Sequence, residues 1–156
     1  MNLPIDIRVR EARELEAEAN QFYQLCGSNG KVDPANTLVL AYQGNKMVGM
    51  VRFCFEKDVH MLRTMRVHPN FQRRGIGLKI LARFQSLLNE NKIQKTLCLP
   101  YAHLVSFYGT IGFKQIHNES APQFLQERLK QTQVNYPATE LIIMSRISPF
   151  GQAPKA

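Results

Sequence analysis

Hydrophobic positions along the chain follow two spacings that alternate from segment to segment. A spacing of two predicts a strand, and a spacing of three and four predicts an amphipathic helix. Ile5, Ile7 and Val9 alternate with polar residues, which predicts a half-buried strand. The following stretch, Glu11–Leu25, has apolar residues three and four positions apart, which predicts a helix. The chain is therefore expected to open with a strand and a helix.

The next segment predicts a hairpin followed by a third strand. The apolar runs Thr37–Tyr42 and Lys46–Phe55 are separated by Gln43-Gly44-Asn45, a sequence typical of a tight turn. A third run, Val59–Val67, follows another short turn. Alternation in the second run is expected to place five residues on one face: Met47, Gly49, Val51, Phe53 and Phe55.

Helical and extended spacings continue to alternate in the second half of the chain. The expected helices are Gly75–Glu90, Ala102–Thr110 and Ala121–Gln131. The expected strands are Thr96–Leu99, Phe113–His117 and Glu140–Ile147. With no repeat and no linker, these elements predict one α/β domain over residues 1–148. Residues 149–156 show no pattern and are expected to form a frayed tail.

Length and composition fit an ordinary globular domain. The chain has 156 residues, of which 44% are hydrophobic and 21% charged, and this excludes disorder, collagen and coiled coil as the main architecture. Cys26, Cys54 and Cys98 have the spacing of no metal or redox motif, so we expect buried thiols and no metal. Without a leader or a long apolar run, we expect a cytoplasmic protein with no membrane partner.

The charge balance is more informative than the composition. Twenty lysines and arginines against twelve acidic residues give a net charge of +8. Such an excess indicates an anionic partner, which leaves nucleic acid, a membrane surface and a phosphorylated small molecule open.

A glycine-rich loop, Gln72-Arg73-Arg74-Gly75-Ile76-Gly77, lies between an expected strand and an expected helix. The free N–H groups and dipole of a helix start, together with two arginines, suit a pyrophosphate. Neither the Walker loop nor the dinucleotide fingerprint fits, because Gly-Lys-Ser/Thr is missing and Ile80 stands where the third glycine belongs. On glycine spacing alone, a surface turn with solvated arginines is the simpler interpretation.

Two motifs together resemble a known family. The string His-Pro, then Gln-Arg-Arg-Gly-Ile-Gly, then an amphipathic helix resembles motif A of the GNAT superfamily of N-acetyltransferases. Thirty residues later, Phe107-Tyr108-Gly109-Thr110-Ile111-Gly112-Phe113 looks like the Phe-Tyr-x-x-x-Gly-Phe segment of that family. The resemblance covers about Ile5 to Ile147. It implies a GNAT fold, with a mixed, mostly antiparallel sheet of about six to seven strands, flanked by helices and splayed at the cofactor-binding strand.

The resemblance also implies a cofactor and a reaction. Acetyl-CoA is the expected acetyl donor, and the acceptor is a primary amine of a small molecule or protein, attacking directly through a tetrahedral intermediate. Tyr108 matches the general acid that protonates the departing thiolate. The expected cofactor-binding residues are those of the last strand segment and the loop: Met65, Arg66, Val67, Gln72, Arg73, Arg74, Gly75, Ile76, Gly77 and Leu78. Loop binding of a small anion explains much of the net charge, through Arg63, Arg66, Arg73, Arg74, Lys79 and Arg83.

The sequence departs from the family pattern at three positions. Tyr101 and Leu104 replace a common Asn and Ala, which makes the cofactor channel bulkier beside the second helix. Met61 replaces a common Glu that serves as general base. The base is left open among a water chain and five side chains: His60, Glu56, Asp58, His103 and Glu119.

Two rival functions are consistent with parts of the sequence. A non-catalytic acyl-CoA-binding or regulatory domain would keep the loop without the acid–base chemistry. A nucleic-acid-binding module is disfavoured, because aromatic residues are not interleaved with the basic loop. The segment from Asn118 to Pro137 could form a wall of the acceptor site, although a solvated helix packed on the sheet edge is simpler. The protein is expected to be a monomer or a homodimer.

Overall fold

Seven strands form one sheet in the computed structural model, which describes residues 3–148. The order across the sheet is β1-β2-β3-β4-β5-β7-β6. Only the β4–β5 pair is parallel. The strands are β1 (Ile5–Glu11), β2 (Thr37–Gln43), β3 (Lys46–Glu56), β4 (Val59–Val67), β5 (Lys95–Cys98), β6 (Lys114–Gln115) and β7 (Met144–Ile147). The predicted mixed, mostly antiparallel sheet is confirmed.

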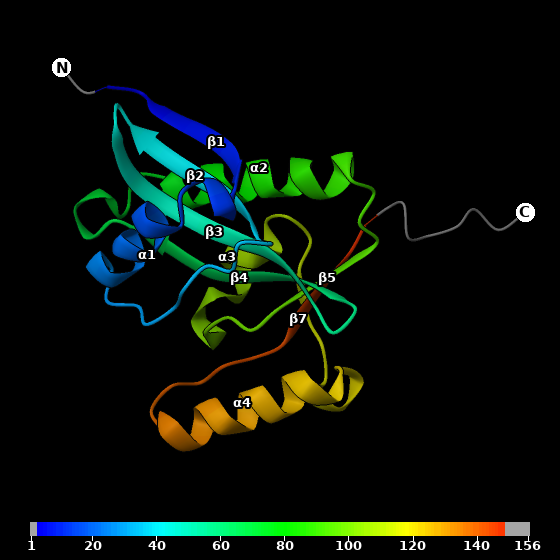
Figure 1. Ribbon diagram of the computed structural model, residues 1–156. Coiled ribbons are helices and arrows are strands. Elements are labelled where there is room, and N and C mark those ends of the chain that lie inside the picture. Colours follow the sequence, from blue (N-terminus) through cyan, green and yellow to red (C-terminus); the bar gives the residue numbers. More distant parts are fainter. Residues whose placement is uncertain (1–2, 149–156) are drawn as a thin grey trace, which may run out of the picture.

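Helices cover both faces of this sheet (Figure 1). They are α1 (Glu16–Leu25), α2 (Ile76–Glu90), α3 (Val105–Gly109) and α4 (Gln123–Asn135). The α2 and α3 helices pack on one face, where Ile80, Phe84 and Tyr108 belong to the largest hydrophobic cluster. The α1 helix packs on the other face over β2 and β3, and α4 packs there over β4 and β5.

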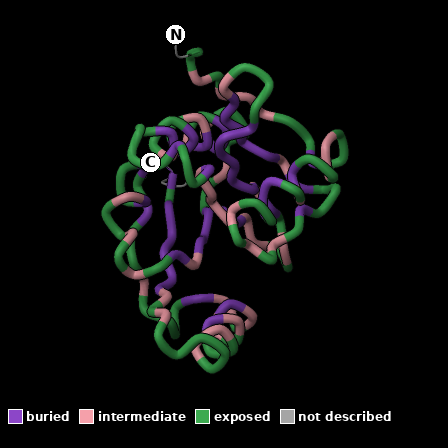
Figure 2. Tube along the Cα trace, turned by 90° about the vertical axis from the view of Figure 1, so that its left-hand side faces the viewer, coloured by how far each residue is buried: buried purple, intermediate pink, exposed green. Residues whose placement is uncertain are grey.

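The alternation along β2 shows how the sheet serves both faces. Leu38 and Leu40 pack with α1, whereas Val39 and Ala41 pack with α2. Since every second side chain points to the opposite face, a strand between two helical layers is apolar throughout. The middle of β2 is accordingly buried, and Figure 2 shows burial concentrated in the strands and exposure in the outer turns.

The β4 and β5 strands separate after a short paired region. Their register contains only His60 opposite Thr96 and Met61 opposite Leu97. The remainder of β4, to Val67, pairs only with β3. The sheet is therefore splayed at β4, as the family resemblance implied.

One predicted face is wrong because β3 contains a bulge. Ala41 pairs with Gly49 and Tyr42 pairs with Met47, which leaves Val48 as an extra residue. A single extra residue shifts the alternation of side chains, so that residues on its two sides no longer follow one common pattern of faces. Met47 therefore packs under α1, on the face opposite Val51 and the other members of the predicted set.

Several element boundaries differ from the predicted ones. Pairing of β1 continues to Glu11, so the first α-helix begins only at Glu16, after a 3-10 turn. The final strand begins at Met144 instead of Glu140, because the preceding residues bond to the segment Pro100–Ala102. The expected strand Phe113–His117 is reduced to Lys114–Gln115. The tail at 149–156 lies outside the described residues. Over the described part of the chain, no helix has the length and apolar character of a membrane span.

Gly49 allows α2 to pack closely on the sheet, and this contact generates a stability prediction. A Cβ at this position would lie 2.6 Å from Ile80 Cδ1 and 3.2 Å from Ile76 Cγ2. We expect Gly49→Ala to lower the free energy of unfolding by roughly 1–3 kcal/mol, measured by chemical denaturation, since an overpacked core is strained. Gly109→Ala is the control, because a Cβ there meets no atom within 4 Å.

The clash can be tested by removing the atom that causes it. Ile80→Val deletes Cδ1, so in the double variant with Gly49→Ala we expect a loss clearly smaller than the sum of the two single losses. Additive losses would show that the contact with Ile80 is not the source of the strain.

Candidate active site

The β4 strand carries a bulge at the point where it leaves β5. Arg52 pairs with Arg63 and Met50 pairs with Arg66, so two residues of β4 face one residue of β3. Thr64 has a φ of 50°, in the left-handed region that β-branched residues rarely adopt. A conformation of this kind persists only where its surroundings hold it.

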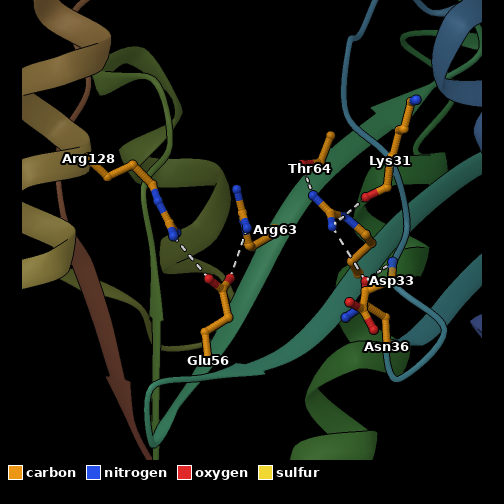
Figure 3. A network of polar contacts seen from close by, with 8 residues as sticks. Lys31, Asp33, Asn36, Glu56, Arg63, Thr64 and Arg128 are labelled. Atoms are coloured by element: carbon orange, nitrogen blue, oxygen red, sulfur yellow. Dashed lines mark hydrogen bonds and ion pairs between the residues drawn. The ribbon is translucent and has the colours of Figure 1, made fainter.

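Two side chains hold Thr64 in this conformation. The hydroxyl of Tyr23 donates to the Thr64 carbonyl oxygen at 2.8 Å. Arg52 Nη2 donates to Thr64 Oγ1 at 3.0 Å, and Figure 3 shows this guanidinium contact at the labelled Thr64. Arg52 is itself anchored, because it is only 6% exposed and donates to the Lys31 carbonyl oxygen at 2.9 Å. Burial raises the pKa of the Tyr23 phenol, which keeps it a donor. The α1 helix and β3 thus fix the bulge from two sides.

A groove of about 590 Å³ begins beyond the bulge, beside the last residues of β4 and the start of α2. Nine of the ten residues expected to bind the cofactor line it: Met65, Arg66, Val67, Gln72, Arg73, Gly75, Ile76, Gly77 and Leu78. The tenth, Arg74, is absent from the lining, and its guanidinium lies 4.9 Å from the centre of the Phe71 ring. The structure therefore brings together the strand and the loop that sequence placed in one site.

The start of α2 is open toward this groove. Gly75 precedes the helix with a φ of 77°, and no side chain caps the helix start. The first N–H groups of a helix then remain available to an anion, and the helix dipole favours negative charge there. A Cβ at Gly77 would lie 3.0 Å from Phe107 Cζ, so glycine also allows α3 to approach the loop.

The basic residues are less concentrated at the loop than the sequence suggested. Arg66 and Arg73 line the groove. Arg83 instead pairs with Glu90 along α2, at 3.1 Å. Arg63 pairs with Glu56 at 2.9 Å and lines a different cavity. Arg63 precedes the bulge in β4 and Arg66 follows it, and of these two arginines only Arg66 lines the groove.

Tyr108 lies where three cavities meet. It lines the groove and two smaller cavities of about 320 and 200 Å³ between β4, β5 and α4. Its side chain is buried, and burial raises the pKa of the phenol; the neighbouring Cys98 also raises it, and Arg66 lowers it. The phenol therefore keeps its proton at neutral pH. A protonated hydroxyl at the junction of a groove and two cavities is suited to donate a proton to a leaving group.

The α4 helix supplies one wall of the two smaller cavities. Leu125 and Leu129 pack it onto the sheet, while Arg128 and Thr132 line the 200 Å³ cavity. Thr132 and Tyr136 line the 320 Å³ cavity. The α4 helix therefore packs on the sheet and also lines both cavities, and its part in an acceptor site stays a prediction. Arg128 is two-thirds buried and ion-paired with Glu56.

Tyr101 and Leu104, the two departures from the family pattern, both line the 320 Å³ cavity. Leu104 also lines the groove. The ring of Tyr101 stacks on His103 at a centroid distance of 5.8 Å. The expected bulk beside the second helix is therefore present on the α4 side of Tyr108.

None of the five candidate bases lines a cavity that contains Tyr108. His60 packs against Phe55, and together with Asp58 it lines a separate cavity near Lys92. Glu56 is engaged by two arginines. His103 lines another cavity beside Glu140, and Glu119 is exposed. Among the described residues, no Asp, Glu or His lines the groove or the two smaller cavities.

Sequence reasoning missed Thr64 and Arg52 as parts of the site. A threonine and an arginine in a strand pattern carry no signal of a bulge, because a register shift depends on the partner strand. The thiols followed expectation in part: Cys54 and Cys98 are buried, while Cys26 is half-buried and lines the groove. Within residues 3–148, no group of three His, Cys, Asp or Glu side chains is arranged to hold a metal ion.

Comparison with known proteins decides the family. A family model described as an acetyltransferase (GNAT) domain matches residues 11–126, a range that includes the bulge, the loop and Tyr108. The chain belongs to the GNAT acetyltransferase family. No curated protein matches the sequence.

Solved structures of other GNAT proteins have the same fold. The ribosomal-protein-S18-alanine N-acetyltransferase of Escherichia coli matches with a TM-score of 0.67 and 18% identity, covering 98% of this chain and 100% of that one. The N-acetylglutamate synthase of Neisseria gonorrhoeae, complexed with coenzyme A and N-acetyl-glutamate, matches with a TM-score of 0.67 and 13% identity, covering 91% of this chain. The match covers 35% of the synthase.

A third structure, a GNAT family acetyltransferase from Elizabethkingia anophelis with acetyl-CoA bound, matches with a TM-score of 0.59 and 16% identity. The match covers 92% of this chain and 98% of that one. At these identities the likeness is one of fold.

The contact between Tyr23 and the bulge generates a second prediction. Tyr23→Phe removes the donor to the Thr64 carbonyl oxygen, and an unsatisfied buried acceptor costs roughly 1–3 kcal/mol of unfolding free energy. We expect that loss in chemical denaturation, together with faster hydrogen exchange at the backbone of Thr64–Val67. Tyr136→Phe, an exposed tyrosine, is the control. Equal exchange in both variants would show that Tyr23 does not hold the bulge.

Proposed function

We propose that this protein is an acetyl-CoA-dependent N-acetyltransferase that transfers an acetyl group directly to a primary amine. The observation that carries the proposal is the position of Tyr108, where the groove lined by the motif A loop meets two cavities on the other side of the splayed strand. Two substrates entering from opposite sides would meet at this hydroxyl. Membership of the GNAT family supports the same reaction type.

The groove has the features required by the acetyl donor. The open start of α2, with Gly75 in a left-handed conformation and Arg73 beside it, would hold the pyrophosphate. The edge of β4 that has separated from β5 would pair with the extended pantetheine arm, like an added strand. A backbone N–H in the segment Met65–Val67 would polarise the acetyl carbonyl. Related structures with coenzyme A or acetyl-CoA bound support this assignment.

The transfer requires one bond to form and one to break. The neutral amine nitrogen attacks the thioester carbonyl carbon and forms a C–N bond, giving a tetrahedral intermediate. The C–S bond then breaks, and the sulfur leaves with the electron pair and takes a proton from Tyr108. The resulting phenolate is reprotonated from solvent, and the proton from the amine also passes to solvent.

No side-chain base is required if the amine arrives neutral. Arg63, Arg66 and Arg128 line the two smaller cavities, where they face no lining carboxylate among the described residues. Positive charge near an ammonium lowers its pKa and so favours the neutral, nucleophilic form. We infer that water removes the proton and that the cavity's charge replaces a dedicated base.

Among the described residues, no side-chain base lines the cavities around Tyr108, and this also favours one rival function, a non-catalytic acyl-CoA-binding domain. Such a protein would bind acetyl-CoA in the groove without turning it over. Measurement of both binding and transfer distinguishes the two functions, because the rival predicts the first without the second.

Tyr108→Phe tests the catalytic proposal. The variant keeps the ring in the core but removes the proton donor, and general acid catalysis typically contributes roughly 10²–10⁴-fold. We expect kcat to fall by about that factor, while the affinity for acetyl-CoA, measured by calorimetry, stays within about twofold of the wild type. The assay is thiol release from acetyl-CoA with a panel of primary amines. Unchanged turnover would remove Tyr108 from the mechanism.

The pH dependence follows from the environment of Tyr108. Burial raises the pKa of this phenol above its usual value of about 10, so the acid form persists through the alkaline range. We therefore expect kcat/KM to rise with pH as the acceptor amine loses its proton, and to show no decline below about pH 9.5. A decline with a midpoint near pH 8, in enzyme that is still folded by circular dichroism, would contradict this role.

A further inference from the structure

The 200 Å³ cavity beside Tyr108 is lined by two arginines from different elements. Arg63 comes from β4 and Arg128 from α4, while the rest of the lining is neutral. Its volume is below the roughly 300–1,000 Å³ typical of pockets for drug-sized ligands, so it suits a small molecule. A second small cavity, which contains Arg66, shares Tyr108 and Thr132 with it. The charged residues that line these two cavities, where an acceptor would lie, are therefore all arginines.

Glu56 holds the two guanidinium groups in place. Its Oε1 accepts from Arg63 Nη1 at 2.9 Å and its Oε2 from Arg128 Nη2 at 3.0 Å, as Figure 3 shows. Burial raises the pKa of the Glu56 carboxyl, but Arg128 and Arg63 outweigh that effect and hold the pKa below its usual range. Glu56 is thus ionised, and the cluster of two cations and one anion keeps one positive charge in excess.

The donors of this cluster are only partly used. A guanidinium has five N–H groups. Among the described residues, Arg63 and Arg128 each donate one hydrogen bond, in both cases to Glu56. Nη1 of Arg128 is buried and has no acceptor. Because a water-sized molecule does not reach this nitrogen, the donors open to a ligand are other free N–H groups of the two guanidinium groups, whose side chains are 33% and 32% exposed.

The cluster is also fixed before any ligand binds. Arg128 lies over the Phe124 ring, 5.5 Å from its centre, and its carbonyl oxygen accepts from the Thr132 hydroxyl at 3.0 Å. Glu56 bonds to both guanidinium groups and so holds an arginine of β4 and an arginine of α4 close to each other. Preorganised arginine forks of this kind match the two oxygens of a carboxylate.

We propose that the acceptor is a small α-amino acid whose carboxylate binds Arg128 and Arg63, which places its amino group beside Tyr108. This inference rests on the proposed acetyltransferase function and adds the chemical class of the acceptor. The one excess positive charge is neutralised by one carboxylate. A polyamine or an aminoglycoside, by contrast, would bring further positive charge to a cavity that holds no compensating anion in its described lining.

The test compares acceptors that carry the carboxylate with acceptors that lack it. Three pools are incubated with radiolabelled acetyl-CoA: the standard L-amino acids, the matching amino acid carboxamides, and the polyamines putrescine, spermidine and spermine. We expect label to enter the amino acid pool roughly 10- to 100-fold faster than either of the others, the range given by a charged hydrogen bond. Preference for the carboxamides or the polyamines would overturn the inference.

A second experiment uses variants of the cluster formed by Glu56, Arg63 and Arg128. Arg128→Gln should raise KM for the preferred amino acid by roughly 10- to 100-fold, with clearly smaller effects on kcat and on KM for its carboxamide. Arg128→Lys should recover part of the loss. Lys130→Gln is the matched control, since it removes one exposed positive charge from the same helix. Equal KM values for wild type and Arg128→Gln would overturn the inference.

Failure of the inference can be distinguished from failure of the proposed function. If acetyl-CoA binds and either the carboxamides or the polyamines are acetylated in preference, the enzyme is an acetyltransferase and only the acceptor class is wrong. If acetyl-CoA binds and no pool is acetylated, the acceptor is not an amino acid, and Tyr108→Phe with the wider amine panel decides the function. If acetyl-CoA does not bind, both are wrong. Denaturation midpoints for each variant show that it is folded.

Discussion

The bulge at Thr64 is the constraint on which the rest of the site depends. Two residues of β4 oppose one of β3, and beyond this point β4 no longer pairs with β5. A threonine with positive φ is unfavourable by itself, so Tyr23 and Arg52 must supply the contacts that hold it. The buried contacts of Tyr23 and Arg52 thus stabilise the bulge, and the groove and cavities lie along the part of β4 that does not pair with β5.

The same separation sorts charge into two regions. Arg63 lies before the bulge and lines the 200 Å³ cavity, whereas Arg66 lies after the bulge and lines both the groove and the 320 Å³ cavity. Glu56 then holds Arg63 and Arg128 together across the cavity on the α4 side. A basic excess that looks uniform in the sequence therefore divides into a loop suited to a phosphorylated donor and a smaller cluster suited to a carboxylate. Tyr108 lies between the two regions and lines both.

Much of the fold follows from local pattern because each element is strongly periodic. The α2 helix, with Ile80, Leu81 and Phe84 on one face, was predicted almost to the residue. Predictions failed where pairing decides the outcome. Met47 faces the opposite side because Val48 is an extra residue relative to β2, and β7 shortens because the residues before it bond to the segment after β5. Register is a property of two strands, so one strand's pattern does not contain it.

The family, the α/β order of elements, and the loop and tyrosine motifs could be predicted from the sequence, because periodicity and motif spacing are local properties of the chain. Only the tertiary structure decided which residues share the site. It joined Arg128 of α4 to Arg63 of β4 through Glu56, and it left His60, His103 and Glu119 outside the cavities around Tyr108. The reason is physical: Arg63 and Arg128 are 65 positions apart in the chain, and only sheet register and helix packing set the distance between them.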